Sequence, residues 1–261
     1  MHNKAIFSYN GKKYSSIDIL KSLREVGIKE GDSIFVHSQL KYFGKIISDT
    51  PRNKFIGSFI DSLKASVGRE GNLIMPAFSY TFCKKEDFYP DTTPSTVGVI
   101  TENFRKADNV KRSIDPIFSV AALGPKSGYF TDVGTNCFGK NSIFEKLYQN
   151  NVKMVFLGER FDITFMHFVE QKLDVCYRFI KKFKGKIKIG NQMKEFEFYY
   201  NVRPLDKSIE YDLDKIARYF MSCGILQEAR LGNSKIRCVG SVDAFASLTQ
   251  AIRKDIHFLL K

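Results

Sequence analysis

Predicted strands and helices alternate along the first two thirds of the chain. The clearest strand runs from Val152 to Leu157, a mainly apolar segment that Gly158 ends. Strands and helices that alternate with short connections build a sheet with helices packed on both of its faces. The pattern therefore predicts an α/β fold of three layers, α/β/α, around a mostly parallel central sheet.

The remaining elements repeat this alternation and then change character. Helices are expected at Ser15–Val26, Phe55–Val67, Thr96–Arg105, Leu213–Phe220 and Val242–Leu259, and strands at Ser33–His37, Leu73–Met75 and Ser119–Leu123. Near residues 184–202, alternating apolar residues on both sides of Gly190-Asn191 predict an appended antiparallel hairpin. No repeat or low-complexity linker divides the chain, so we expect one domain over residues 1–261 with the hairpin as an insertion.

The 261-residue chain carries 41 Lys and Arg against 28 Asp and Glu, a formal net charge of +13. A field of this sign attracts anions and repels polycations. One class that fits the charge is a nucleic-acid binder, because 14% of the residues are aromatic and could stack on bases beside a lysine track. No RNA-binding or helix-turn-helix motif accompanies the charge, and the aromatic residues fall at core-facing positions, so nucleic acid is only a remote alternative.

Membrane, disulfide and metal classes are disfavoured by the residue pattern. No segment reaches the roughly 18–20 uncharged apolar residues of a membrane-spanning helix, and the start of the chain lacks the apolar core of a signal peptide. We therefore expect a cytoplasmic protein with no membrane partner. The five cysteines are widely spaced and form no CxxC pair, which predicts reduced, mostly buried thiols and no metal site.

The segment most informative for chemistry leads from the strand at Val152–Leu157 into a helix that carries Thr164, His167 and Glu170. A spacing of three places these side chains along one helical face. Open α/β sheets bind ligands at the carboxyl ends of their strands, where a carboxylate one turn further on can orient a histidine as a general base. The alternative is a histidine that only packs against the sheet.

Three further segments place polar side chains near expected strand ends. His37 and Ser38 end one strand, and Ser79 and Tyr80 follow the bend that Pro76 imposes on another. Residues 111–119 offer cationic and hydroxyl groups that suit a phosphate or pyrophosphate, namely Arg112, Ser113 and Ser119. Each segment also fits a turn or a solvated surface, as does the basic run from Arg178 to Lys188.

Four motifs follow one another in a specific order. They are Val36-His37-Ser38-Gln39-Leu40 with Gly44, Gly71-Asn72-Leu73-Ile74-Met75-Pro76, Arg112-Ser113-Ile114-Asp115-Pro116, and Leu157-Gly158 leading to Thr164, His167 and Glu170. Each motif is weak alone, but the four together, which span almost the entire chain, are specific. Their order and spacing resemble the aminoglycoside 3-N-acetyltransferase family.

The resemblance implies an acetyl-CoA-dependent enzyme that moves an acetyl group directly to the amine of an amino sugar, without a metal. His167 is then the base that takes the amine proton, Glu170 orients it, and Thr164 lines the acyl centre. The implied CoA side comprises His37, Ser38, Arg112, Ser113 and Ser119, and the implied acceptor side comprises Ser79, Tyr80, Asp115 and Ile163. The residues suit this chemistry, because an alkylammonium must lose a proton before it attacks a thioester and histidine titrates in the useful range.

Two positions depart from the family pattern, and both bear on the acceptor. Asp115 stands where histidine is common before the proline, and Ile163 stands where asparagine is common before the threonine. The positive net charge disfavours a polycationic aminoglycoside. We therefore expect a nucleotide-linked amino sugar for surface-polysaccharide synthesis as the preferred acceptor, with aminoglycoside acetylation and antibiotic resistance as the alternative. The sequence leaves the formation of a homo-oligomer open.

Overall fold

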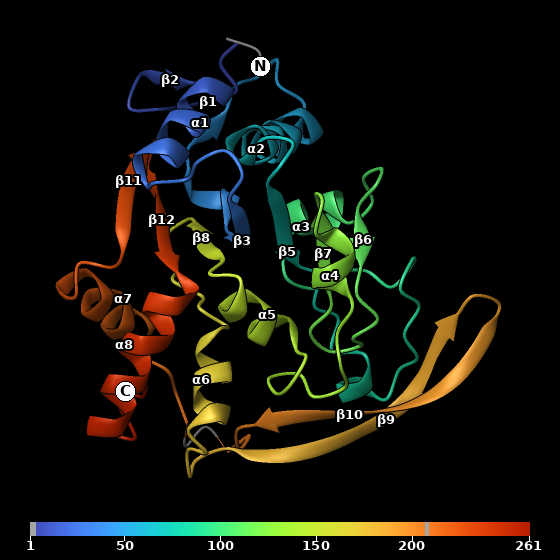
Figure 1. Cartoon of the computed structure of the whole chain (residues 1–261). Coiled ribbons are helices and arrows are strands. Elements are labelled where there is room, and N and C mark those ends of the chain that lie inside the picture. Colours follow the sequence, from blue (N-terminus) through green and yellow to red (C-terminus); the bar gives the residue numbers. More distant parts are fainter. Residues whose placement is uncertain (1–3, 207–208) are drawn as a thin grey trace.

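The computed structural model describes residues 4–206 and 209–261 and arranges them around a seven-stranded sheet (Figure 1). In order across the sheet, the strands are β11 (Gln227–Leu231), β12 (Ser234–Gly240), β8 (Lys153–Leu157), β3 (Ser33–Ser38), β5 (Asn72–Pro76), β7 (Val120–Leu123) and β6 (Lys111–Arg112). β3 pairs in parallel with both β5 and β8, whereas the outer strands pair antiparallel. The α/β class is confirmed, with parallel pairing at the three central strands.

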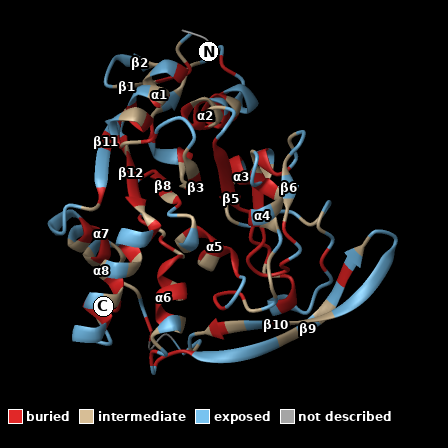
Figure 2. Ribbon diagram, viewed as in Figure 1, coloured by how far each residue is buried: buried red, intermediate tan, exposed pale blue. Residues whose placement is uncertain are grey.

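Helices cover both faces of this sheet. One face carries α1 (Ser16–Glu25), α2 (Arg52–Val67) and α3 (Val99–Phe104), and the other carries α4 (Ser127–Thr131), α5 (Ile143–Gln149), α6 (Met166–Lys172), α7 (Leu213–Ser222) and α8 (Ser241–Lys254). Because successive strand residues point to opposite faces, Val155 and Leu157 of β8 pack beneath the first group, while Met154 and Phe156 pack beneath the second. Figure 2 shows the buried residues gathered along the strands and the inner helix faces. The predicted three layers are therefore present.

The expected elements occur close to their predicted positions, and some elements were not expected. α1 begins where Ser15 donates its backbone N–H and its hydroxyl to Asp18 at 2.7 and 2.9 Å, as in a capping box. The last helix ends at Lys254, earlier than predicted. The sequence did not predict the small sheet of β1 (Phe7–Tyr9), β2 (Lys12–Tyr14) and β4 (Lys45–Ile46), nor β6, β11, β12, α4 and α5. Most of these elements are too short to show a period.

The antiparallel hairpin is longer than predicted and packs against the rest of the chain. It consists of β9 (Phe179–Ile189) and β10 (Gln192–Val202), which cross the lower edge of the view in Figure 1. Gly185 lies so close to the ring of Phe82 that a Cβ atom there would stand 2.6 Å from it. Phe198 of β10 meets the same ring edge-on at 5.9 Å. The inner face of the hairpin therefore contributes aromatic side chains to the core.

The described residues contain no helix that is both long and apolar enough to cross a membrane. Cys137 and Cys238 are buried, but Cys83, Cys176 and Cys223 are exposed. The expectation of mostly buried thiols is thus wrong. Cys83 lies in the short 3-10 helix Phe82–Lys84, Cys176 lies in a turn, and Cys223 directly follows α7. A small apolar side chain need not be covered in such short surface segments.

Candidate functional site

A histidine and a glutamate on α6 form a close side-chain pair at the candidate site. His167 and Glu170 lie one helical turn apart, and Nδ1 of His167 stands 2.6 Å from Oε2 of Glu170. The Glu170 side chain is fully buried, whereas 16% of the His167 side chain is exposed. The spacing predicted from the sequence therefore brings the two groups into hydrogen-bond contact. Only the imidazole reaches the surface.

Aromatic rings enclose the imidazole. Phe138 meets it edge-on with ring centroids 5.5 Å apart, and Tyr211 meets it at 5.2 Å. Tyr200 of the hairpin packs against Phe138 at 5.8 Å and so extends this wall. None of these three residues was predicted as a site residue, because an aromatic at a core-facing position gives no separate signal in a sequence.

An arginine that was expected on a solvated surface is buried beside this pair. Arg178 is 7% exposed and donates from Nη1 to Oε2 of Glu170 at 2.9 Å. The hydroxyl of Tyr211 donates to Oε1 of the same carboxylate at 3.0 Å. The expectation for the basic run is thus wrong at Arg178. The available signal was that it is the one arginine among lysines, and arginine is favoured where a planar fork of donors meets a carboxylate.

Burial and neighbouring charge set the ionisation of the pair. Burial lowers the pKa of His167, and the adjacent Arg178 lowers it further against the opposing effect of Glu170. Burial raises the pKa of Glu170, but contact with His167 and Arg178 outweighs it, so the net shift is downward. Glu170 is therefore a carboxylate, and His167 is neutral at neutral pH.

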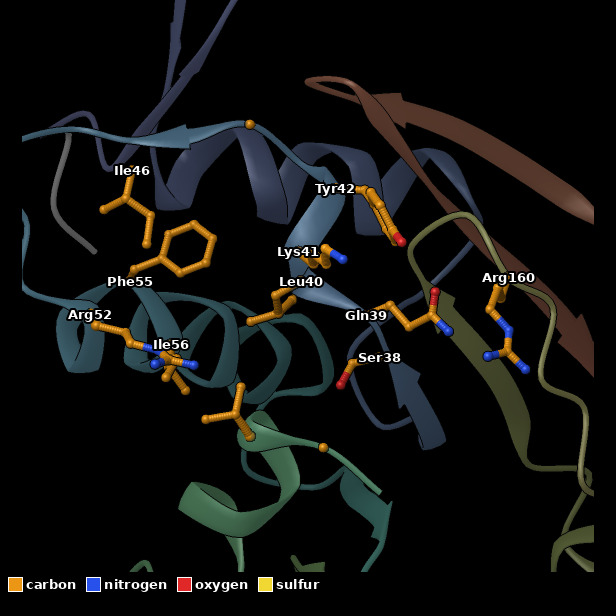
Figure 3. A pocket seen from close by; sticks show the side chains of 13 residues that line it. Ser38, Gln39, Leu40, Lys41, Tyr42, Ile46, Arg52, Phe55, Ile56 and Arg160 are labelled. Carbon is orange, nitrogen blue, oxygen red and sulfur yellow. The ribbon is translucent and has the colours of Figure 1, made fainter. Parts of the chain in front are cut away.

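A cavity of about 580 Å³ opens at the carboxyl end of β3 (Figure 3). Its lining residues are Ser38, Gln39, Leu40, Lys41, Tyr42, Gly44, Ile46, Arg52, Phe55, Ile56, Gly98, Val99 and Arg160. Figure 3 shows Arg52, on α2, at one side of this pocket and Gln39 with Arg160 at the other. The described lining residues include three cations and no carboxylate, so the pocket suits an anion with an apolar part.

The loop from Gly158 to Phe165 connects this pocket to α6. The Gln39 backbone N–H donates to the carbonyl of Leu157 at 2.6 Å, and its side-chain amide donates to Asp162 at 2.9 Å. The same carboxylate pairs with Arg160 at 2.9 Å. Oε1 of Gln39 is buried and has no hydrogen-bond partner among the described residues, so it is an acceptor ready for an N–H donor.

The predicted CoA-side residues fall into two groups. Ser38 lines the pocket, but His37 does not. The His37 ring stacks on Phe156 with centroids 5.4 Å apart, and burial lowers the pKa of His37 to about 4. Arg112, Ser113 and Ser119 lie at the β6–β7 edge and make hydrogen bonds within the protein.

Arg112 donates to the carbonyls of Ala77, Pro90 and Thr93 and to the Ser119 hydroxyl. The Ser113 hydroxyl accepts from the Val120 amide at 2.9 Å. Arg112 and Ser119 would have to give up hydrogen bonds that they donate before they could hold a phosphate, and Ser113 is buried. Cofactor binding by these three residues stays a prediction.

The predicted acceptor-side residues are mostly internal. Ser79 donates to the carbonyl of Pro116 at 2.9 Å, Asp115 accepts from the amides of Ile117 and Phe118 at 2.7 and 2.8 Å, and Ile163 is in the core. Burial raises the pKa of Asp115 to about 6.

Tyr80 is half-buried, with a left-handed φ of 57°, and packs on Phe118 at 5.4 Å. Thr164 is half-buried in the turn before α6, which begins at Met166, so the expectation that it shares a helical face with His167 and Glu170 is wrong. Its carbonyl accepts from the His167 amide at 3.1 Å. Tyr80 and Thr164 are thus the members of the acceptor and acyl sets that the structure leaves partly accessible.

The sequence of the chain is similar to those of known acetyltransferases. A family model described as aminoglycoside 3-N-acetyltransferase matches residues 35–253. Aminoglycoside N(3)-acetyltransferase IV from Salmonella sp is 32% identical over 117 residues, which cover 44% of this chain and 41% of that relative's length.

Two solved structures share the fold. AAC-VIa bound to sisomicin has a TM-score of 0.80 at 18% identity over 92% of this chain and 98% of its own. The binary complex of AAC-IIIb with CoASH has a TM-score of 0.79 at 20% identity over 92% and 97%. The resemblance drawn from the sequence motifs is confirmed.

Proposed function

The chain belongs to the aminoglycoside 3-N-acetyltransferase family, and on this premise we propose that it transfers an acetyl group from acetyl-CoA to an amine of an amino sugar. The observation that carries the proposal is the buried His167–Glu170 pair, whose imidazole alone reaches the surface. Acetyl-CoA supplies an acyl group activated as a thioester. The protein has to deprotonate the acceptor amine and hold both substrates in register.

His167 is the base in this proposal. An imidazole that is neutral at neutral pH can take a proton from an ammonium group, and its Nδ1 is already engaged with Glu170, so Nε2 is the nitrogen left for the substrate. Glu170 fixes the ring orientation through the 2.6 Å contact. Thr164, which precedes α6 and is partly accessible, lines the acyl centre.

The pocket at the end of β3 is the proposed place for CoA. Lys41, Arg52 and Arg160 supply positive charge for its phosphates, and the pocket borders the first turns of α2, which contain no acidic residue and whose dipole favours an anion. The unpartnered Oε1 of Gln39 suits one of the amide N–H groups of the pantetheine arm. Ser38 lies on the same wall.

We infer that the acceptor is an aminoglycoside, which reverses the order that net charge suggested. The names of the similar proteins, one of them bound to sisomicin, support this acceptor. One observation keeps a nucleotide-linked amino sugar as a second candidate: Glu170, the carboxylate beside the base, is already neutralised by Arg178 and offers no free negative charge to a polycation. The net charge of +13 points the same way.

Release of the CoA thiol tests the proposal. Acetyl-CoA is incubated with the protein and with either a panel of aminoglycosides or a panel of nucleotide-linked amino sugars, and the free thiol is followed with a chromogenic reagent. We expect turnover with aminoglycosides and none in the His167→Ala variant. Turnover with nucleotide-linked sugars alone would establish the second candidate, and an absence of release with both panels would refute an acetyltransferase of amino sugars.

A further inference from the structure

The carboxylate of Glu170 is held on three sides. Oε2 lies 2.6 Å from Nδ1 of His167 and 2.9 Å from Nη1 of Arg178, and Oε1 accepts from the Tyr211 hydroxyl at 3.0 Å. Arg178 is itself anchored, because its Nε donates to the carbonyl of Asn201 at 2.8 Å and its Nη2 donates to the same oxygen. The carboxylate therefore has one fixed orientation.

The positions of the protons around Glu170 follow from a count of the hydrogen-bond donors and acceptors that meet there. If Nδ1 of His167 carried no proton, a bare nitrogen lone pair would face a carboxylate oxygen at 2.6 Å, which is repulsive. Nη1 of Arg178 has two protons, and Oε2 of Glu170 at 2.9 Å and the Tyr211 oxygen at 2.6 Å accept them. Although Nη1 lies only 2.7 Å from Nδ1, it has no proton left to give it.

We propose that Arg178 and Tyr211 are positioning residues that hold Glu170 so that its carboxylate fixes His167 in the uncharged, Nδ1-protonated form, with Nε2 free to accept the proton of the acceptor amine. The inference deepens the proposed function and rests on it for the identity of the proton donor. The assignment of the tautomer itself rests on the distances alone.

The charges around His167 also favour an uncharged imidazole. The groups that face the imidazole are Glu170 on α6, Arg178 before β9, Tyr211 before α7, and, at longer range, Arg203 after β10. The charges of Glu170 and Arg178 cancel, so a proton on His167 would create a net buried positive charge. Without Arg178, the carboxylate would favour the imidazolium, which cannot act as a base.

Imidazole nitrogen chemical shifts in the substrate-free protein test the tautomer without any assay of activity. Long-range proton–nitrogen correlation spectra distinguish a protonated Nδ1 from a protonated Nε2, and a His167→Gln spectrum identifies the signals among those of His2, His37 and His257. We expect a neutral ring protonated at Nδ1 at pH 7. A ring protonated at Nε2, or an imidazolium, overturns the proposal.

Kinetic variants test the two positioning residues. In Arg178→Gln, the acid limb of the kcat/KM profile should move to higher pH by about one unit, because the positive charge that opposes the imidazolium is gone. Arg178→Lys, which keeps the charge, should leave the limb near its wild-type position. In Tyr211→Phe, kcat should fall by about fivefold with the KM for acetyl-CoA unchanged, since one of the donors that hold Glu170 is lost.

The control is Tyr219→Phe, another half-buried tyrosine, whose hydroxyl donates to the Ser247 carbonyl at 3.4 Å. It should behave as wild type. If the acid limb of the kcat/KM profile does not move in Arg178→Gln, the positioning role of Arg178 is overturned. If kcat is unchanged in Tyr211→Phe, the positioning role of Tyr211 is overturned. If Arg178→Gln does not fold, the Tyr211→Phe kinetics and the wild-type nitrogen shifts decide. If the nitrogen shifts are as expected but no acceptor is turned over, the proposed function is refuted and the tautomer assignment still holds.

Discussion

Nδ1 of His167 lies 2.6 Å from Oε2 of Glu170, and the same carboxylate oxygen accepts from a buried arginine at 2.9 Å. The carboxylate is therefore shared between an imidazole and a permanent cation. The carboxylate can therefore orient the imidazole, while the charge of Arg178 offsets its tendency to stabilise an imidazolium. The arrangement suits a residue that must be neutral before it takes a proton.

Loss of the imidazole should remove catalysis and spare the fold. We expect His167→Ala to lower kcat by about 10²- to 10⁴-fold, the usual contribution of a positioned general base. The side chain is partly exposed and packs mainly on Phe138 and Tyr211, so thermal unfolding should change little. Thiol release and a melting curve measure the two effects. The matched control is His257→Ala, an exposed histidine, and near-normal activity of the His167 variant would refute the proposed base.

Removal of the charge on Glu170 should cost stability because it strands Arg178. The two side chains are 0% and 1% exposed, and an uncompensated buried charge costs about 3–5 kcal/mol. Glu170→Gln should therefore unfold at a lower denaturant concentration. Arg178→Met in the same background should restore part of the loss, because no charge then remains in the cluster. Strictly additive effects in this double-mutant cycle would show that the two groups are not coupled.

Arg52 should contribute to the binding of CoA through its charge. It lines the pocket on α2, and an exposed cation that meets a phosphate is worth about 1 kcal/mol, or about fivefold in Kd. Titration calorimetry of Arg52→Gln with CoA measures the loss, and a rise in salt should reduce the difference from wild type. Lys54→Gln is the control, since Lys54 lies on the same helix but lines a different hollow. Equal losses in the two variants would indicate a general field effect without a specific contact.

The sequence predicted the central strands and the contact between His167 and Glu170, but not the residues that surround this pair. Strands β3, β5 and β8 are apolar runs closed by turn residues, and this local pattern is visible without tertiary information. The spacing of His167 and Glu170 is likewise local, since both lie on one helix. Their meeting therefore follows from helical geometry alone.

Arg178, Tyr211 and Gln39 illustrate what could not be predicted. Arg178 and Tyr211 lie 33 positions apart in the chain and meet only because the hairpin returns β10 beside the start of β9. Gln39 was noted within a motif, but its unpartnered oxygen depends on where the loop after β8 runs. Conversely, Arg112, Ser113 and Ser119 suit phosphate by residue type, yet the fold engages them in internal hydrogen bonds. Residue type alone cannot show where a polar group already has a partner within the protein.

His37 should make the protein sensitive to mild acid. Burial lowers its pKa to about 4 in the folded protein, whereas an unfolded chain has a histidine pKa near 6.5. Between these values the unfolded state binds more protons, so this contribution to stability is complete above about pH 6.5 and is lost as the pH falls toward 4. The difference corresponds to at most about 3 kcal/mol. Denaturant unfolding at pH 7 and pH 4.5 should show a smaller loss in His37→Gln than in wild type, because glutamine does not titrate. The exposed His257→Gln variant should lose as much as wild type, and a His37→Gln variant with the full wild-type loss would show that other groups cause the acid sensitivity.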